Sequence, residues 1–215
     1  MMNLFTKQSL SIGLIWIFHI SGLIGIIYSN ASWFIKATPF NLLLCFALLI
    51  INIEWNKKLF LLVVTCFSVG MFSEIIGVNY GFLFGEYSYG NALGIKFKGV
   101  PLIIGINWCL LVFITGYISR FFFNSLIART FLGIFLMLSL DVVMEPIAPV
   151  LDFWKFKEGL ASFNNYFGWA IVSFPLQLLF HKLNQNIEGP FPFHLYILQF
   201  LFFTILLLKI NSIGI

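Results

Sequence analysis

Long apolar runs recur along this chain, and most are close to the roughly 20 residues that a helix needs to cross a bilayer. Charged residues make up only 9% of the sequence. Backbone groups inside a bilayer must be paired within their own segment, so such runs fold as helices. The sequence predicts an all-α, polytopic membrane helix bundle, one integral-membrane domain over 1–215 with about seven transmembrane helices. The predicted spans are 10–28, 37–54, 59–80, 100–121, 126–145, 166–182 and 193–210.

Two segments leave the helix count open. The run 37–54 is short, and the stretch 78–99 has a composition that also suits re-entry into the membrane, so six or eight helices fit as well. The first run is longer than the roughly 7–15 residues of a secretory signal core, so we expect an uncleaved first helix.

Charge and cysteine content exclude several classes of protein. The net charge is +4, but the basic residues are scattered through the loops, so no nucleic-acid patch is predicted. Six basic residues fall on each expected side of the membrane, so the positive-inside rule gives no orientation. Cys45, Cys66 and Cys109 lie inside predicted spans without paired spacing, which predicts neither a disulfide framework nor a metal site.

Three acids, Glu74, Asp141 and Glu145, lie inside or at the ends of these apolar runs. An acid at membrane depth is costly unless it is paired, neutral or wet, so it indicates a functional site. Asp141 and Glu145 are four residues apart and share a helical face, where two carboxyl groups should not both ionise. Such a pair supplies an acid and a base together, and Pro146 should end the helix beside it. Alternatively, Glu145 caps an interfacial helix end in water and Asp141 binds a Ser or Asn on a neighbour.

Connectivity places most of the unusual residues at one membrane face. The end of the third span, the start of the fourth, the end of the fifth and the start of the sixth must lie together. We therefore expect the loops 80–99 and 146–165 to share one face, opposite the N-terminus. These four helix ends carry Glu74, Glu86, Trp108, Asp141, Glu145, Asn165 and Trp169.

Gly77, Gly81 and Gly85 follow Glu74 at four-residue spacing. Such a stripe favours close packing of another helix, and an alternative is a flat ligand against exposed backbone. Both interpretations place Glu74 away from lipid. His19 is alone in the first span and is interpreted as structural.

Several motifs occur in a fixed order over roughly 70–170. They are Glu74-x-x-Gly77, Gly85-Glu86-Tyr87-Ser88-Tyr89, Gly94, Gly99-Val100-Pro101, Trp108, Asp141-x-x-x-Glu145-Pro146, Trp154 and Asn165-Tyr166-Phe167-Gly168-Trp169. With them the chain resembles the carotenoid 1,2-hydratase family of membrane proteins, the gamma-carotene 1′-hydratases and bisanhydrobacterioruberin hydratases. That family often has Asp at positions 86 and 145, and a Gly-Ile-Pro segment where this chain has Leu160-Ala161-Ser162-Phe163.

The resemblance implies addition of water to the terminal C1,C2 double bond of an acyclic carotenoid end, of the gamma-carotene or lycopene type, giving a tertiary alcohol. The implied partners are the carotenoid, water and membrane lipid, without a cofactor, and the expected location is the bacterial cell (inner) membrane. The expected catalytic residues are Glu74, Asp141 and Glu145, and the expected substrate-binding residues are Glu86, Tyr87, Tyr89, Trp108, Asn165 and Trp169.

The residues suit this chemistry. Hydration of an unactivated alkene begins with protonation by a positioned acid, and aromatic faces stabilise the resulting cation. The alternative from another class is a proton-coupled transporter that uses the acids as a relay, although no internal repeat supports it. A retinal photoreceptor would need a lysine well inside the last span, whereas Lys209 is near its end. The sequence leaves open which acid donates the proton, which carotenoid reacts and the oligomeric state.

Overall fold

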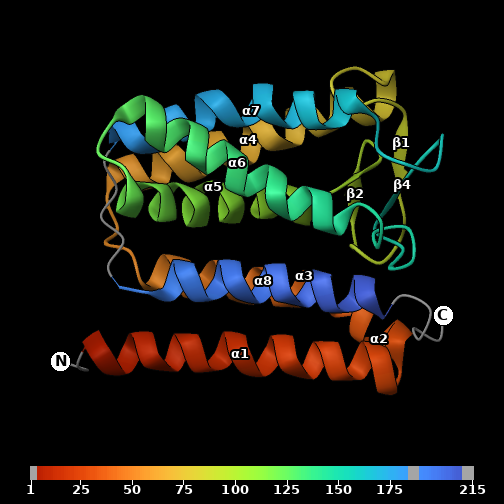
Figure 1. Cartoon of the computed structure of the whole chain (residues 1–215), viewed down its shortest axis with the longest axis horizontal. Coiled ribbons are helices and arrows are strands. Elements are labelled where there is room, and N and C mark those ends of the chain that lie inside the picture. Colours follow the sequence, from red (N-terminus) through yellow and green to blue (C-terminus); the bar gives the residue numbers. More distant parts are fainter. Residues whose placement is uncertain (1–3, 184–188, 210–215) are drawn as a thin grey trace.

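The computed structural model describes residues 4–183 and 189–209, and this part of the chain is an all-α bundle with two small antiparallel ladders (Figure 1). Each of the seven predicted runs lies largely within a helix. The helices are α1 (Leu4–Tyr28), α2 (Ala31–Lys36), α3 (Thr38–Ile51), α4 (Lys57–Tyr80), α5 (Ile103–Phe122), α6 (Leu126–Met144), α7 (Phe163–Leu183) and α8 (Phe191–Leu208). The strands are β1 (Tyr87–Tyr89), β2 (Lys96–Phe97), β3 (Val100–Pro101) and β4 (Trp154–Phe156).

The membrane character of the bundle is confirmed. In the described residues, α1, α4, α5, α6 and α8 are long and apolar enough to span a bilayer. α3 is apolar but has only 14 residues. α7 has 21 residues but is less apolar, because it carries asparagine, serine, glutamine and histidine. Five helices therefore meet both requirements for a span, against the seven predicted.

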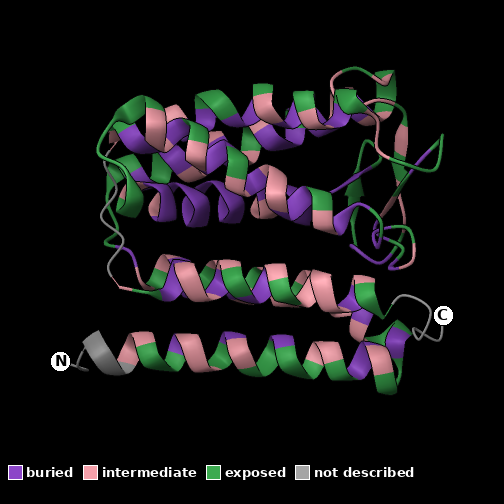
Figure 2. Ribbon diagram, viewed as in Figure 1, coloured by how far each residue is buried: buried purple, intermediate pink, exposed green. Residues whose placement is uncertain are grey.

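α5 is the central helix of the bundle. It packs against α3, α4, α6, α7 and α8. Of the residues in its apolar 18-residue stretch, 78% are buried, compared with 28% in the corresponding stretch of α1 (Figure 2). α1 lies at the margin, where it contacts α2, α3 and α8. The exposed apolar side chains of α1 are the surface that a membrane protein turns toward lipid.

The two loops that were predicted to share one face do so. β1 pairs antiparallel with β4, with Tyr87 opposite Phe156 and Tyr89 opposite Trp154. The ladder lies at the end of the bundle opposite the start of α1 (Figure 1). A second contact joins the two loops: Oδ2 of Asp152 accepts a hydrogen bond of 2.8 Å from the backbone N–H of Asn91. The loops together close this end of the bundle.

The predicted glycine stripe is wrong as a helix-packing surface. Gly81 has a φ of +64° and caps the end of α4, and Gly85 has a φ of +88° in the loop that follows. This left-handed region favours glycine. A Cβ on Gly77 would lie 2.7 Å from the ring of Phe84 and 2.8 Å from the hydroxyl of Tyr87. Gly77 therefore makes room for Phe84 and Tyr87, which belong to the loop that covers Glu74.

Candidate active site

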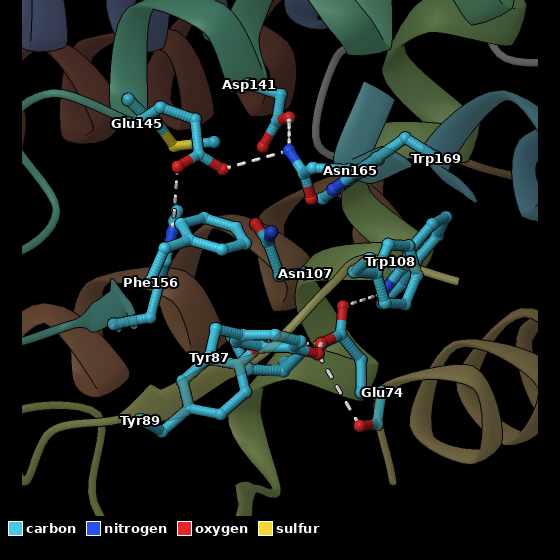
Figure 3. Close-up of a pocket in the computed structure, with 14 residues that line it drawn as sticks. Glu74, Tyr87, Tyr89, Asn107, Trp108, Asp141, Glu145, Phe156, Asn165 and Trp169 are labelled. Atoms are coloured by element: carbon cyan, nitrogen blue, oxygen red, sulfur yellow. Dashed lines mark hydrogen bonds between the residues drawn. The ribbon is translucent and has the colours of Figure 1, made fainter. Parts of the chain in front are cut away.

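A buried cavity at the loop-covered end of the bundle contains all three predicted acids (Figure 3). We call it the acid cavity. Its volume is about 30 Å³, which leaves room for water, since a water molecule needs roughly 10–15 Å³ by the same measure. No basic side chain is among the lining residues, which are Glu74, Phe84, Tyr87, Tyr89, Ile104, Asn107, Trp108, Asp141, Met144, Glu145, Trp154, Phe156, Asn165 and Trp169.

Glu74, from α4, accepts hydrogen bonds from three aromatic side chains. The hydroxyls of Tyr87 and Tyr89 donate to its Oε2, the latter over 2.7 Å. The indole Nε1–H of Trp108 donates to Oε1 over 3.0 Å. Glu74 is only 4% exposed, and burial penalises a charge that has no partners. Three donors on two oxygens replace the lost water and suit a carboxylate.

Asp141 and Glu145 meet at the side-chain amide of Asn165, which comes from α7. Its Nδ2 donates to Asp141 Oδ2 over 2.9 Å and to Glu145 Oε1 over 3.1 Å. Both acids are buried, which opposes the alternative of a solvated Glu145. The other half of that alternative, Asp141 bound to an Asn on a neighbour, agrees with the hydrogen bond from Asn165. α6 ends at Met144, directly before Glu145 and Pro146. This agrees with the prediction that Pro146 ends the helix beside the two acids.

The second oxygen of Asp141 is free. Its Oδ1 is buried and has no hydrogen-bond partner in the part of the chain that the structure describes. A buried acceptor without a partner is costly, whereas the O–H of a protonated carboxyl group can point to a ligand. The surrounding protein covers this atom, so water or substrate can meet it only when neighbouring side chains move.

Burial also raises the pKa values of three site residues outside the helices, Glu145, Tyr87 and Tyr89. Glu145 follows the last residue of α6, and burial raises its pKa to about 7. Burial and the neighbouring Glu74 raise the pKa values of Tyr87 and Tyr89 well above their usual range. The two tyrosines thus remain neutral donors, while Glu145 can change its charge near neutral pH.

Two tryptophans form one wall of the site. The rings of Trp108 and Trp169 are stacked, with centroids 4.4 Å apart and an interplanar angle of 18°. Glycines allow this arrangement: a Cβ on Gly70 would lie 2.4 Å from the ring of Trp108, and one on Gly168 would lie 2.4 Å from the carbonyl oxygen of Leu83. Trp108 turns its Nε1–H edge toward Glu74, and the stacked rings cover each other's facing sides, so only an outer face of the pair could attract a cation.

Glu86, which was predicted to bind substrate, is not among the residues that line the acid cavity. Its side chain is 64% exposed and pairs with Lys157. Successive strand residues point to opposite sides. Because Tyr87 and Tyr89 point inward from β1, Glu86 falls on the outer side. The other predicted site residues all line the cavity.

The sequence interpretation missed Asn107 and Trp154 as site residues. Asn107 lies between the Asp141–Glu145 pair and Glu74 in Figure 3. An amide next to Trp108 in an apolar run was an available signal. Trp154 belongs to the motif set, and its Nε1–H donates to Glu145 Oε2 over 3.4 Å.

The remaining candidates lie elsewhere. The three cysteines are free and buried. His19 contacts the carbonyl oxygen of Ile15 at 2.7 Å through its Nδ1 and is not in the acid cavity. In the described residues, no group of three His, Cys, Asp or Glu side chains is arranged to hold a metal ion.

An apolar helix bundle with a buried acidic site defines a membrane protein with an internal polar centre. The chain matches the carotenoid biosynthesis protein family over residues 32–214, and it belongs to this family. Its role is therefore in carotenoid biosynthesis. No curated protein and no solved structure matches the chain.

Proposed function

We propose that this protein is a carotenoid 1,2-hydratase of the bacterial inner membrane, which adds water to the terminal C1,C2 double bond of an acyclic end of gamma-carotene or lycopene type. The observation that carries the proposal is the acid cavity, where a carboxyl pair faces a third carboxylate across aromatic walls (Figure 3). Family membership supports a carotenoid as the substrate.

Asp141 is the proposed proton donor. Its Oδ1 has no hydrogen-bond partner among the described residues, and Asp141 is one of the residues that line the cavity. The proton passes to C2, the less substituted alkene carbon, so that the positive charge develops at the tertiary C1. Asn165 fixes the other oxygen of Asp141 and so sets the direction of the acid. A positioned acid of this kind typically contributes roughly 10²–10⁴-fold.

Glu74 and the tryptophan wall stabilise the cation. The carboxylate of Glu74 supplies a negative charge at close range in a site of low dielectric. An outer face of the stacked pair of Trp108 and Trp169 adds cation–π attraction without a nucleophile. The donors on Glu74 keep its oxygens occupied, which disfavours their addition to the cation.

Glu145 is the proposed base. Water attacks C1, a C–O bond forms, and the proton released from the water passes to Glu145. Transfer of that proton back to Asp141, one helical turn away, restores the starting state. Water addition leaves the overall oxidation level of the substrate unchanged, so the proposed reaction consumes no oxidant or reductant.

Isotopic labelling under anaerobic conditions tests the proposal. Membranes that contain the protein are supplied with lycopene in heavy water, and separately in ¹⁸O-labelled water. We expect a product heavier than lycopene by one water, with one non-exchangeable deuterium on the carbon next to the alcohol carbon and with oxygen from solvent. Oxygen that comes only from O₂ would identify a hydroxylase and overturn the proposal.

A proton-coupled transporter is the second candidate, and one feature of α7 favours it. Asn165, Ser173, Gln177 and His181 are buried at spacings of four or eight residues, the pattern of a relay along one helical face. However, Gln177 donates to Thr115 over 2.7 Å, which also explains its presence as a structural group. Proton uptake by vesicles with unchanged pigment would support transport instead of hydration.

A further inference from the structure

A larger cavity lies between α1, α2, α3 and α8, and we call it the chamber. Its volume is about 500 Å³, within the roughly 300–1,000 Å³ of small-molecule sites. Its lining is mainly aliphatic and aromatic and contains no Asp, Glu, Lys or Arg. Exposed Ile17, Trp33 and Phe40 belong to this lining, so the chamber reaches the outer surface of the bundle.

A middle cavity of about 50 Å³ lies between the chamber and the acid cavity and shares lining residues with each of them. Met144 and Trp154 line both the acid cavity and the middle cavity. Phe153 and Gln199 line both the middle cavity and the chamber. Phe153 and Trp154 are adjacent in the sequence, and between them they border all three cavities. Their rings stack with centroids 6.1 Å apart. The cavities form one series from the outer surface to the acids.

We propose that the chamber binds the conjugated chain of a linear polyene, whose reacting end passes through the middle cavity to the acids. This inference rests on the proposed function. Burial of hydrocarbon in an apolar cavity is favourable. The two inner cavities have volumes of only about 30 and 50 Å³, so a slim acyclic end would displace fewer side chains there than a ring would. Met144, a flexible side chain in the wall between them, can rotate to admit a slim acyclic end. A cyclised end therefore stays outside.

Bulk added to the chamber wall tests the assignment. Gly22 lines the chamber, and a Cβ there would meet Phe202 at an ordinary 3.5 Å, so Gly22→Ala, Gly22→Leu and Gly22→Phe form a graded series. Gly13 on the same helix has nothing within 4 Å of an added Cβ, so Gly13→Phe is the matched control. The proteins are placed in phosphatidylcholine vesicles with lycopene, and with geraniol as a short probe that carries the same terminal alkene.

We expect Gly22→Phe to lower lycopene hydration by roughly tenfold or more, because the added ring takes up space in the chamber that the polyene would occupy. Gly22→Leu should fall between Gly22→Ala and Gly22→Phe, geraniol hydration should stay near wild type, and Gly13→Phe should retain both. Wild-type lycopene turnover in Gly22→Phe would overturn the assignment, as would equal loss of both substrates across the series.

Pigment retention separates this inference from the proposed function. Lycopene that stays with the purified protein is measured by its visible absorbance, which requires no turnover. If the wild type hydrates neither substrate, the proposed function fails, and lower retention by Gly22→Phe than by Gly13→Phe still supports the chamber. Equal retention by both variants would show that lipid tails or nothing specific occupies it, and would overturn the inference.

Discussion

The side-chain Nδ2 of Asn165 lies 2.9 Å from Oδ2 of Asp141, although the two residues come from different helices. The same nitrogen also contacts Glu145, so one amide fixes the spacing of both acids. An amide has two N–H donors, and here both are directed at carboxyl oxygens. Asn165 is therefore a positioning residue for the proposed acid and base.

Replacement of this amide should change the positions of Asp141 and Glu145 while both acids stay in the site. We expect Asn165→Leu to lower kcat by roughly tenfold to a hundredfold, the equivalent of one or two lost hydrogen bonds to buried charged groups, and to shift the pH profile of kcat. Pigment mass spectrometry over a pH series measures both. The neighbouring Asn164 is exposed, so Asn164→Leu should behave as wild type. An unchanged pH profile in Asn165→Leu would contradict the positioning role.

Removal of each titratable proton should abolish most of the turnover. Asp141→Asn, Glu145→Gln and Glu74→Gln keep the side-chain shapes, and we expect at least two of them to lose roughly 10²–10⁴-fold in hydration rate while still inserting into membranes. Insertion is checked by the yield of monodisperse protein. Glu54→Gln is the control, since Glu54 is exposed in the turn between α3 and α4. Wild-type rates in all three variants would leave the acids as structural groups.

The convergence of Glu74, Asp141 and Asn165 was predictable because connected helix ends must share a face. That constraint needs only span boundaries, and the pairing of β1 with β4 confirms it. The same constraint says nothing about which way a loop side chain points. It could not show that Glu86 lies outside the acid cavity, because the orientation of the β1 side chains depends on the partner strand and on the packing of Tyr87 against Gly77.

The glycines and the chamber show a different limit. Four-residue spacing indicates a helical stripe only while the helix continues, and α4 ends before Gly81. The chamber forms between α1 and α8, which are far apart in the sequence. Its wall is apolar like the rest of the surface, so no residue pattern marked it.

Gly70 should be essential for the position of Trp108. A Cβ at Gly70 would lie 2.4 Å from the indole ring, a distance that forces the ring to shift from Glu74. We expect Gly70→Ala to lose roughly 1–3 kcal/mol of stability through overpacking and to lower the hydration rate. Thermal unfolding in detergent and turnover are the measurements. Gly13→Ala, with open space around the new methyl group, should change neither, and a fully active Gly70→Ala would contradict the proposed role of Trp108.

Glu145 should make stability and turnover depend on pH in opposite directions. Burial raises its pKa from 4.5 to about 7, so the folded protein binds this proton more tightly than the unfolded chain. The resulting stability is fully present below the unfolded value and is lost as pH rises through about 7. The melting temperature should therefore fall from pH 5 to pH 8. Turnover should rise over the same range, because the proposed base must be ionised to accept a proton from water.

Glu145→Gln separates the two effects. Glutamine does not titrate, so the decline in melting temperature should flatten while turnover stays low at every pH. Glu54→Gln should keep the slope of the wild type, because Glu54 is exposed. Melting curves followed by tryptophan fluorescence, and hydration rates in the same buffers, give both profiles. A Glu145→Gln protein with the wild-type slope would show that another group causes the decline, and wild-type turnover that falls toward pH 8 would assign Glu145 the role of acid instead of base.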